Sequence, residues 1–338
     1  MSAAGAAGAA DAAGAADAAG AAGAAGAAGA AGAAGAAESH ASRAPRPPWA
    51  HFREALDSVG FHPSRRLGQN FLLDENAARA IARDAAVGPG DLVLEVGPGC
   101  GFLSVHLAHD GVRLLAVEVD ERLAPIAARF LEPYPASEVL LGDVLAGKRQ
   151  LNPMVEERLP ASGPWHLVSN LPYAIAAPLL ALVAGRSNPP ASLTVLVQKE
   201  VGERLVAVPG TRAWGPLSVA IQTALAPRIL RQLGPSLFWP RPKVDSTLVR
   251  AEVLRPLASR SDRQRCTTLA ARLLRHRRQG LVRVLGDLLG DREQALVHLA
   301  ELSLDPRGRA ECLDLEQLRR LAARLGDRLG TAPGDPGG

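Results

Sequence analysis

Short apolar runs alternate with segments of helical periodicity through the middle of the chain. Within each run apolar residues stand at successive positions, with no regular apolar/polar alternation, which is typical of parallel strands buried on both faces. Predicted strands cover residues 91–97, 113–120, 138–144, 165–170 and 192–198. Because helical segments separate these strands, the pattern predicts a doubly wound, mostly parallel sheet of the α/β class.

The predicted helices start and stop at recognisable residues. Asp74 is a suitable N-cap for a helix that runs to about Val87, where the Gly-Pro-Gly turn of residues 88–90 ends it. Other helices are predicted over residues 48–59, 102–110, 121–131, 199–207 and 217–225. Two further strands, 228–233 and 246–253, are expected to pair antiparallel at one edge and to complete a seven-stranded sheet.

After Pro256 helical periodicity replaces the strand pattern. Residues 258–330 read as helices interrupted by Asp-Pro-Arg-Gly-Arg at 305–309. The sequence therefore predicts an α/β domain over residues 45–254 and a small all-α domain over residues 255–330.

The two ends of the chain lack the means to form a core. A Gly-Ala-Ala repeat runs from Gly5 to Ala37, and no proline precedes Pro45, so a collagen-like helix is excluded. With no large side chains to bury, residues 1–44 are predicted to be disordered, as is the short tail 331–338. A codon-repeat expansion without function is the simplest interpretation of the repeat.

Positive charge is concentrated in one segment. The net charge is +4, but residues 1–40 hold three acids and no Lys or Arg, so residues 41–338 carry +7. Residues 255–290 alone hold nine arginines and two acids, which is again +7. This favours a nucleic-acid surface, with a solvated helix face as the alternative. The candidate RNA-binding residues are Arg65, Arg66, Arg272, Arg275, Arg277 and Arg278.

Several protein classes are excluded or disfavoured. Three cysteines without a Cys-x-x-Cys pair cannot form a disulfide framework and disfavour a thiolate zinc site. The eight histidines form no metal-like cluster, so no metal is expected. The sequence shows no strongly apolar stretch of 18 residues and no signal-peptide pattern, so a cytoplasmic location is expected, and nothing demands more than a monomer.

A glycine-rich turn follows the first predicted strand of the sheet. Residues 95–101 read Glu-x-Gly-x-Gly-x-Gly, with glycines at 97, 99 and 101. Glycines let the backbone approach a ligand, and the following helix offers free N–H groups. The dinucleotide fingerprint fails because Phe102 occupies its last slot. The pattern resembles that of S-adenosylmethionine (SAM) methyltransferases, with Gly97, Gly99 and Gly101 as cofactor-binding candidates.

Two acids follow the next two strands. Glu118 ends the second strand, where a carboxylate can accept both ribose hydroxyls, and Asp143 ends the third, where it can accept from an adenine amino group. Open α/β sheets bind ligands at the carboxyl ends of their strands. These two residues are therefore predicted to bind SAM.

Asn170-Leu171-Pro172-Tyr173 ends the fourth strand. An adenine amine is a poor nucleophile, because its lone pair is delocalised into the ring. The Asn170 amide oxygen and the Leu171 carbonyl can accept its two N–H bonds, which favours a pyramidal nitrogen. Pro172 stiffens the turn and Tyr173 can stack on the base. Positioning and charge placement would carry most of the rate, so these four residues are predicted to be catalytic.

With these motifs in order, the chain resembles the KsgA-type ribosomal RNA adenine dimethyltransferases from about Arg65 to Ala322. The matching motifs are RRLGQNFL (65–72), EVGPGCGFL (95–103), VEVD (117–120), GDV (142–144), NLPY (170–173), VQKEV (197–201), WGPLSV (214–219), PRPKVDS (240–246), HRRQ (276–279) and LDPRGRAE (304–311).

The resemblance implies a Rossmann-like class I SAM-dependent methyltransferase fold and a specific reaction. This reaction converts two adjacent adenosines to N6,N6-dimethyladenosine in the loop of the 3′-terminal hairpin of 16S rRNA, within the 30S particle. The family also serves as a checkpoint in small-subunit assembly. Carried over by position, Gln69, Asn70 and Leu72 flank SAM, and Asn170 touches both cofactor and target amine. Phe238 would stack on the flipped base opposite Tyr173.

Three positions depart from the family pattern. Ala174 and Ala176 replace the usual Asn and Ser after the Asn-Leu-Pro-Tyr motif, which removes hydrogen bonds that brace the turn. Pro216 replaces an Arg near the expected RNA face. None of the three is assigned to the chemistry, so an active enzyme is expected.

Three other functions compete with this interpretation. An Erm-type 23S rRNA adenine methyltransferase shares the catalytic core, but the LGQNFL, KVDS and LDPRGRAE motifs favour the KsgA side. A non-catalytic ribosome-assembly or RNA-binding factor would not need Asn170, Tyr173, Glu118 and Asp143 together. A DNA adenine methyltransferase usually carries Asp-Pro-Pro-Tyr and a separate base-reading domain.

Overall fold

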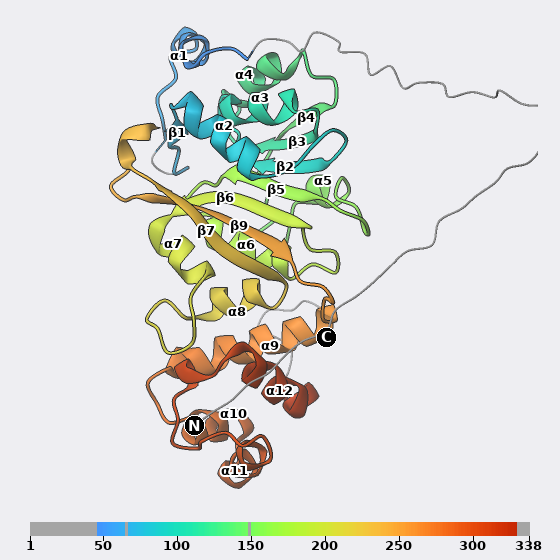
Figure 1. Ribbon diagram of the computed structural model, residues 1–338, viewed down its shortest axis with the longest axis vertical. Helices are drawn as coiled ribbons and strands as arrows, with labels where there is room; N and C mark the ends of the chain where they lie inside the picture. Colours follow the sequence, from blue (N-terminus) through green and yellow to red (C-terminus); the bar gives the residue numbers. More distant parts are fainter. Residues whose placement is uncertain (1–45, 65–66, 148–149, 330–338) are drawn as a thin grey trace, which may run out of the picture. The chain divides into compact units, whose positions relative to one another are not determined.

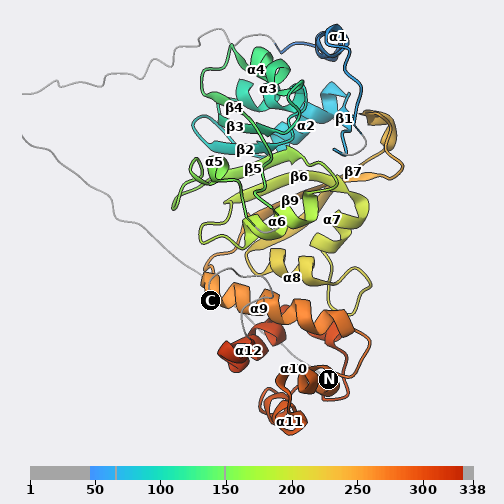
Figure 2. The same cartoon turned by 180° about the vertical axis from the view of Figure 1, so that it is seen from behind.

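The computed structural model describes residues 46–64, 67–147 and 150–329. The predictions for residues 1–44 and 331–338 lie outside this part of the chain. The described residues belong to one compact unit, and its elements are shown in Figures 1 and 2.

A seven-stranded sheet forms the centre of the fold, as predicted. Its strand order is β4-β3-β2-β5-β6-β9-β7. The five strands from β4 to β6 run parallel, and β9 pairs antiparallel with both β6 and β7. The strands are β2 (Leu92–Val96), β3 (Arg113–Glu118), β4 (Ser137–Leu141), β5 (His166–Asn170), β6 (Ser192–Gln198), β7 (Leu225–Leu233) and β9 (Ser246–Val253).

Alternate residues of each strand feed two separate apolar layers. Val93 packs with α1 to α4 on one face, while the adjacent Leu94 packs with α5 to α8 on the other. Both faces are covered because successive strand side chains point to opposite sides. The helices are α1 (Trp49–Ser58), α2 (Glu75–Asp84), α3 (Phe102–His109), α4 (Ala124–Leu131), α5 (Pro153–Glu156), α6 (Ala176–Ala184), α7 (Lys199–Leu205) and α8 (Pro216–Gln222).

Local signals explain where several helices begin. The Asp74 side chain accepts a hydrogen bond from the backbone N–H of Ala77, which confirms it as the N-cap of α2. α4 begins at Ala124 rather than at 121, because residues 121–123 form a turn. Pro216 occupies the first position of α8, where its missing N–H costs nothing.

The residues after β9 form helices, as predicted. These are α9 (Arg260–Leu273), α10 (Leu281–Leu289), α11 (Arg292–Glu301) and α12 (Leu315–Leu325). Trp214 and Val219 join their apolar cluster from the loop before α8 and from α8 itself. The proposed boundary between residues 254 and 255 falls in the turn between β9 and α9 and stays a prediction.

A small second sheet was not predicted. It pairs β1 (Phe71–Leu72) with β8 (Phe238–Trp239), which follows a short 3-10 helix at Pro235–Leu237. Two-residue strands give no periodic signal, and these two lie far apart in sequence. In Figure 1 the loop that carries β8 lies beside β1.

Within the described ranges, no helix is long and apolar enough to cross a membrane.

Candidate active site

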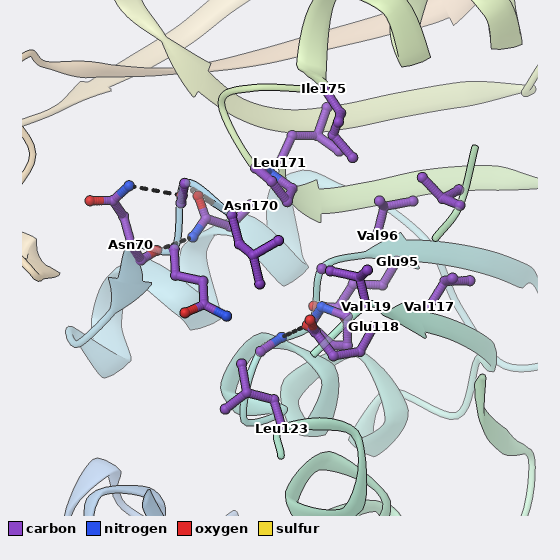
Figure 3. A pocket seen from close by; sticks show the side chains of 18 of the residues that line it. Asn70, Glu95, Val96, Val117, Glu118, Val119, Leu123, Asn170, Leu171 and Ile175 are labelled. Atoms are coloured by element: carbon purple, nitrogen blue, oxygen red, sulfur yellow. Dashed lines mark hydrogen bonds between the residues drawn. The ribbon is translucent and has the colours of Figure 1, made fainter. Parts of the chain in front are cut away.

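A pocket opens at the carboxyl ends of β2, β3 and β5 (Figure 3). Strand ends of an open α/β sheet are where such folds bind ligands. Eleven predicted site residues line it: Gln69, Asn70, Leu72, Gly97, Gly99, Glu118, Asp143, Asn170, Leu171, Pro172 and Tyr173. The tertiary structure therefore brings together five motifs that are separated by up to about 100 residues.

Two predicted residues lie off the lining. Gly101 is packed against α4, since a Cβ there would come 3.2 Å from Ala127 Cα. Phe238 is buried, with 3% of its surface exposed, and pairs with Leu72 across the small sheet. Stacking on a base would require its ring to become accessible, so that role stays a prediction.

The glycine-rich turn fits tightly between two aromatic or cyclic side chains. Gly97 and Gly99 have φ of +69° and +60°, which only glycine adopts readily. A Cβ at Gly97 would lie 2.7 Å from Pro172 Cγ, and one at Gly99 would lie 2.7 Å from Phe71 Cε1. These glycines allow the turn to touch the Asn-Leu-Pro-Tyr turn on one side and β1 on the other.

Glu118 is held in place by the backbone around it. Its Oε2 accepts from the Gly99 N–H and its Oε1 from the Asp120 N–H, both at 2.9 Å. Burial raises the pKa of Glu118, and the two backbone bonds oppose that shift. Each carboxylate oxygen keeps a second lone pair that can accept from a ligand hydroxyl.

Glu95 is a second acid in the pocket wall, and no role was predicted for it from its motif. It is 2% exposed, and its Oε2 has no hydrogen-bond partner among the described residues. Burial raises the pKa of Glu95 to about 8. At neutral pH the carboxyl is therefore mostly protonated and can offer an O–H donor. The sequence signal for a role of Glu95 in the site was its position as the first residue of the glycine motif.

The loop before β1 is fastened over the pocket at two points. Gln69 Nε2 donates to Asp120 Oδ2 at 2.9 Å, and Asn170 Nδ2 donates to the Asn70 carbonyl at 2.9 Å. The guanidinium of Arg122 lowers the pKa of Asp120 to about 2, with the Gln69 bond acting in the same direction. The loop is thus tied to the ends of β3 and β5.

Asn170 is oriented by this contact. Because its Nδ2 faces the Asn70 carbonyl, Oδ1 is the atom left to accept from a ligand. Figure 3 shows the two asparagines side by side at the pocket edge. The structure thus presents the amide oxygen that the predicted chemistry requires.

The turn after Asn170 is braced despite the two alanines. The Leu171 N–H donates to the Leu196 carbonyl at 3.0 Å, and the Ile175 N–H to the Pro172 carbonyl at 3.1 Å. The Tyr173 hydroxyl bonds Ser246 Oγ at 2.8 Å. Ser246 belongs to the PRPKVDS motif, which was the sequence signal for a role near the site.

Ala174 and Ala176 lie in different surroundings. Ala174 is exposed on the pocket rim, whereas Ala176 is fully buried at the start of α6. A polar side chain at 176 would need a partner inside the apolar layer. The braces described above do not depend on either position.

Asp143 lies two residues beyond β4, which ends at Leu141 rather than at the predicted 144. Its Oδ1 accepts from the Leu145 N–H at 2.9 Å and its side chain is exposed at the pocket edge. The second carboxylate oxygen, Oδ2, can accept from a ligand amine.

In the described ranges no group of three or more His, Cys, Asp or Glu could hold a metal ion.

Some arginines of the basic segment 255–290 are exposed, and others form hydrogen bonds inside the protein. Arg275 and Arg278 are exposed and make no ion pair with another described residue. Arg263 is 3% exposed and donates to the carbonyls of Ala184 and Arg186 at the end of α6. The charge of Arg263 therefore belongs to the interior rather than to a surface. Arg272 is half-buried, and Arg65 and Arg66 lie outside the described residues.

Arg277 holds two parts of the chain together. It donates to Glu311 Oε2 at 2.7 Å and to the carbonyls of Thr211 and Arg212 at 2.8 and 3.1 Å. The bond to Arg277 lowers the pKa of Glu311, and the two carbonyl bonds fix the loop before α8 against the C-terminal helices. Arg277 is thus occupied within the chain, and its predicted RNA contact stays a prediction.

The family model described as ribosomal RNA adenine dimethylase matches residues 60–324. The chain belongs to this family. It is an rRNA adenine dimethyltransferase with the fold of class I SAM-dependent methyltransferases.

Two curated relatives extend the family match across most of the chain. Ribosomal RNA small subunit methyltransferase A from Alkaliphilus oremlandii (strain OhILAs) is 37% identical over 280 residues, covering 82% of this chain and 96% of the relative. The protein of the same name from Phenylobacterium zucineum (strain HLK1) is 40% identical over 272 residues, covering 80% and 90%.

Two solved structures show the same fold. A dimethyladenosine transferase from Plasmodium falciparum superposes with a TM-score of 0.62 at 20% identity, covering 75% of this chain and 97% of that one. The 23S rRNA methyltransferase ErmE superposes with a TM-score of 0.57 at 24% identity, covering 75% and 99%. At this identity the two likenesses concern the fold alone.

Proposed function

We propose that this protein uses SAM to convert two adjacent adenosines in the 3′-terminal hairpin loop of 16S rRNA to N6,N6-dimethyladenosine, within the 30S particle. The observation that carries the proposal is the oriented Asn170 amide beside the glycine turn and Glu118 in a single pocket. The names of the curated relatives, small subunit methyltransferase A, support the choice of subunit. We place the reaction in the cytoplasm and the enzyme as a monomer with a role in small-subunit assembly.

The pocket residues fit SAM by their chemistry. The glycine turn lines the pocket with bare backbone at residues 97 and 99, Glu118 offers acceptors for ribose hydroxyls, and Glu95 offers a buried polar atom without a partner among the described residues. Asp143 can accept from the adenine amine, while Gln69, Asn70 and Leu72 border the site. When bound, SAM supplies an electrophilic methyl group on its sulfonium.

The residues of the chain supply the positioning. Asn170 Oδ1 and the Leu171 carbonyl accept from the target amine and keep its lone pair available, and Pro172 fixes the turn against Gly97. Tyr173, anchored by Ser246, offers a ring on which the base can stack. The amine loses a proton after each transfer, and solvent at the open pocket can take it. No strong base is required, because positioning provides most of the acceleration.

The proposal is tested by incubating the purified protein with methyl-labelled SAM and unmethylated 30S particles. Label is expected in the 3′-terminal hairpin of 16S rRNA, as two N6,N6-dimethyladenosines. Free 50S particles serve as the control substrate. Label in 23S rRNA would favour the Erm-type alternative, and absence of label from both subunits would favour a non-catalytic assembly factor.

Substitutions in the basic segment should separate surface contacts from internal ones. We expect Arg275→Gln combined with Arg278→Gln to weaken particle binding and to lower the slope of log affinity against log salt by roughly 1–2. Arg277→Gln should instead lower the melting temperature and leave most of the salt slope, because its contacts are internal. Binding titrations over a salt series, with thermal melts, measure both. An unchanged slope in the double variant would mean that Arg275 and Arg278 make no contact with RNA phosphates and belong only to a solvated helix face.

A further inference from the structure

Trp239 is unusual among the tryptophans of this chain because its indole faces solvent. It is 38% exposed, whereas Trp49 is partly buried and Trp165 and Trp214 are 0% and 1% exposed. Two cations follow it at alternate positions: Arg241 and Lys243 are both exposed and make no ion pair with any other described residue. An exposed aromatic ring interleaved with unpaired cations is the composition that binds single-stranded nucleic acid.

The segment 239–245 is anchored to the pocket at its start. Trp239 pairs with Phe71 across the small sheet, and their ring centroids lie 5.8 Å apart at an interplanar angle of 33°. Phe71 lines the pocket and lies directly against Gly99 of the glycine turn. The ring of Phe71 is therefore the only side chain between Trp239 and the glycine turn in this series of contacts.

The end of the segment is anchored to the proposed catalytic turn. Ser246, the next residue, bonds the Tyr173 hydroxyl at 2.8 Å, and the Asp245 carbonyl accepts from the Lys199 N–H at 3.0 Å. The segment thus spans from Phe71 to Tyr173 along one border of the site. An RNA strand that delivers a base to Tyr173 must place its neighbouring nucleotides close to this border.

We propose that Trp239 stacks on an unpaired nucleobase next to the adenosine being methylated, while Arg241 and Lys243 contact the adjoining phosphates. This inference rests on the proposed function and assigns a second base site outside the catalytic pocket. Every base offers a π-face, so the site tolerates different bases and requires only that the neighbour is unpaired. It favours a hairpin loop over a continuous duplex, whose neighbouring bases remain stacked.

The stack can be observed without catalysis. Trp165 and Trp214 are buried, and Trp49 is partly buried against Phe52 and Phe102. Trp239 is therefore the most exposed of the four indoles and should dominate the fluorescence change when a single-stranded oligoadenylate is added to the full chain. We expect quenching with the wild-type protein, loss of quenching with Trp239→Leu, and an affinity about ten-fold lower or more in that variant. Heparin, a polyanion without bases, should quench little. Equal quenching by heparin, or unchanged quenching and affinity in Trp239→Leu, would overturn the proposal.

A second measurement connects the stack to turnover. On unmethylated small-subunit particles, Trp239→Leu should raise KM about ten-fold with kcat largely retained, since the contact is present before and during methyl transfer. Trp239→Phe should restore most of the loss, and SAM affinity should be unchanged in both. Leu296→Ala, which trims a 41% exposed side chain on α11, is the matched control and should behave as wild type. A KM unchanged by Trp239→Leu would contradict the role.

The two measurements separate this inference from the proposed function. If the wild-type protein methylates no small-subunit particle, the proposed function fails, and the fluorescence experiment still decides whether Trp239 stacks on bases. If methylation is normal and quenching is independent of Trp239, the stack alone is wrong.

Discussion

Asn170→Ala should reduce methylation by about 10²–10³-fold or more while leaving binding to the particle nearly unchanged. The substitution removes the oxygen that accepts from the target amine, and this interaction matters most as the amine attacks. Particle affinity depends on the wider surface, so it should persist. Single-turnover methylation with labelled SAM, beside a particle-binding titration, measures both quantities.

Asn170→Asp provides a matched control for the same position. It keeps an oxygen acceptor but loses the N–H that donates to the Asn70 carbonyl. If the acceptor role dominates, Asp should be more active than Ala. If both variants lose activity and SAM affinity equally, Asn170 acts by bracing the loop, and the catalytic role assigned to it is wrong.

Glu118→Ala should weaken SAM binding by at least about 100-fold. A hydrogen bond to a charged group contributes about 1.5–3 kcal/mol, and two ribose hydroxyls are expected to bond this carboxylate. The variant also frees the Gly99 and Asp120 N–H groups, which loosens the glycine turn. Isothermal titration with SAM measures the loss. Glu121→Ala, an exposed neighbour, is the control and should bind normally.

The same carboxylate predicts a pH dependence. Burial raises the pKa of Glu118 above its ordinary value of 4.5, so protonation begins at a higher pH than in an exposed glutamate. A protonated carboxyl loses acceptor capacity, so SAM affinity should fall as pH falls through this raised pKa. Glu118→Gln should remove this acid limb of the profile. An acid limb that persists in the Gln variant would assign it to another group.

Much of the fold was predicted from the sequence because its signals are local. Buried parallel strands give continuous apolar runs, and caps such as Asp74 mark helix starts within a few residues. The position of β9 between β6 and β7 agrees with the predicted antiparallel edge. The β1–β8 sheet was missed because its two short strands are stabilised by each other rather than by any local pattern.

The candidate site was predicted in composition but only partly in geometry. Glycines, acids and the Asn-Leu-Pro-Tyr turn follow strands whose carboxyl ends meet, so they converge once the sheet is parallel. Burial cannot be read from a motif. The sequence therefore did not predict that Phe238 lies in the core or that burial raises the pKa of Glu95. Likewise, the charge count could not separate the exposed Arg275 from the internally bonded Arg277.

The sequence by itself determined the fold class, the family and the residue types of the site, because periodicity, spacing and motifs are properties of the linear chain. Only the tertiary structure decided which side chains face the pocket. It oriented the Asn170 amide through Asn70 and left Trp239 exposed beside Phe71. These outcomes depend on contacts between residues distant in sequence, whose burial and hydrogen bonding are fixed only when the chain has folded.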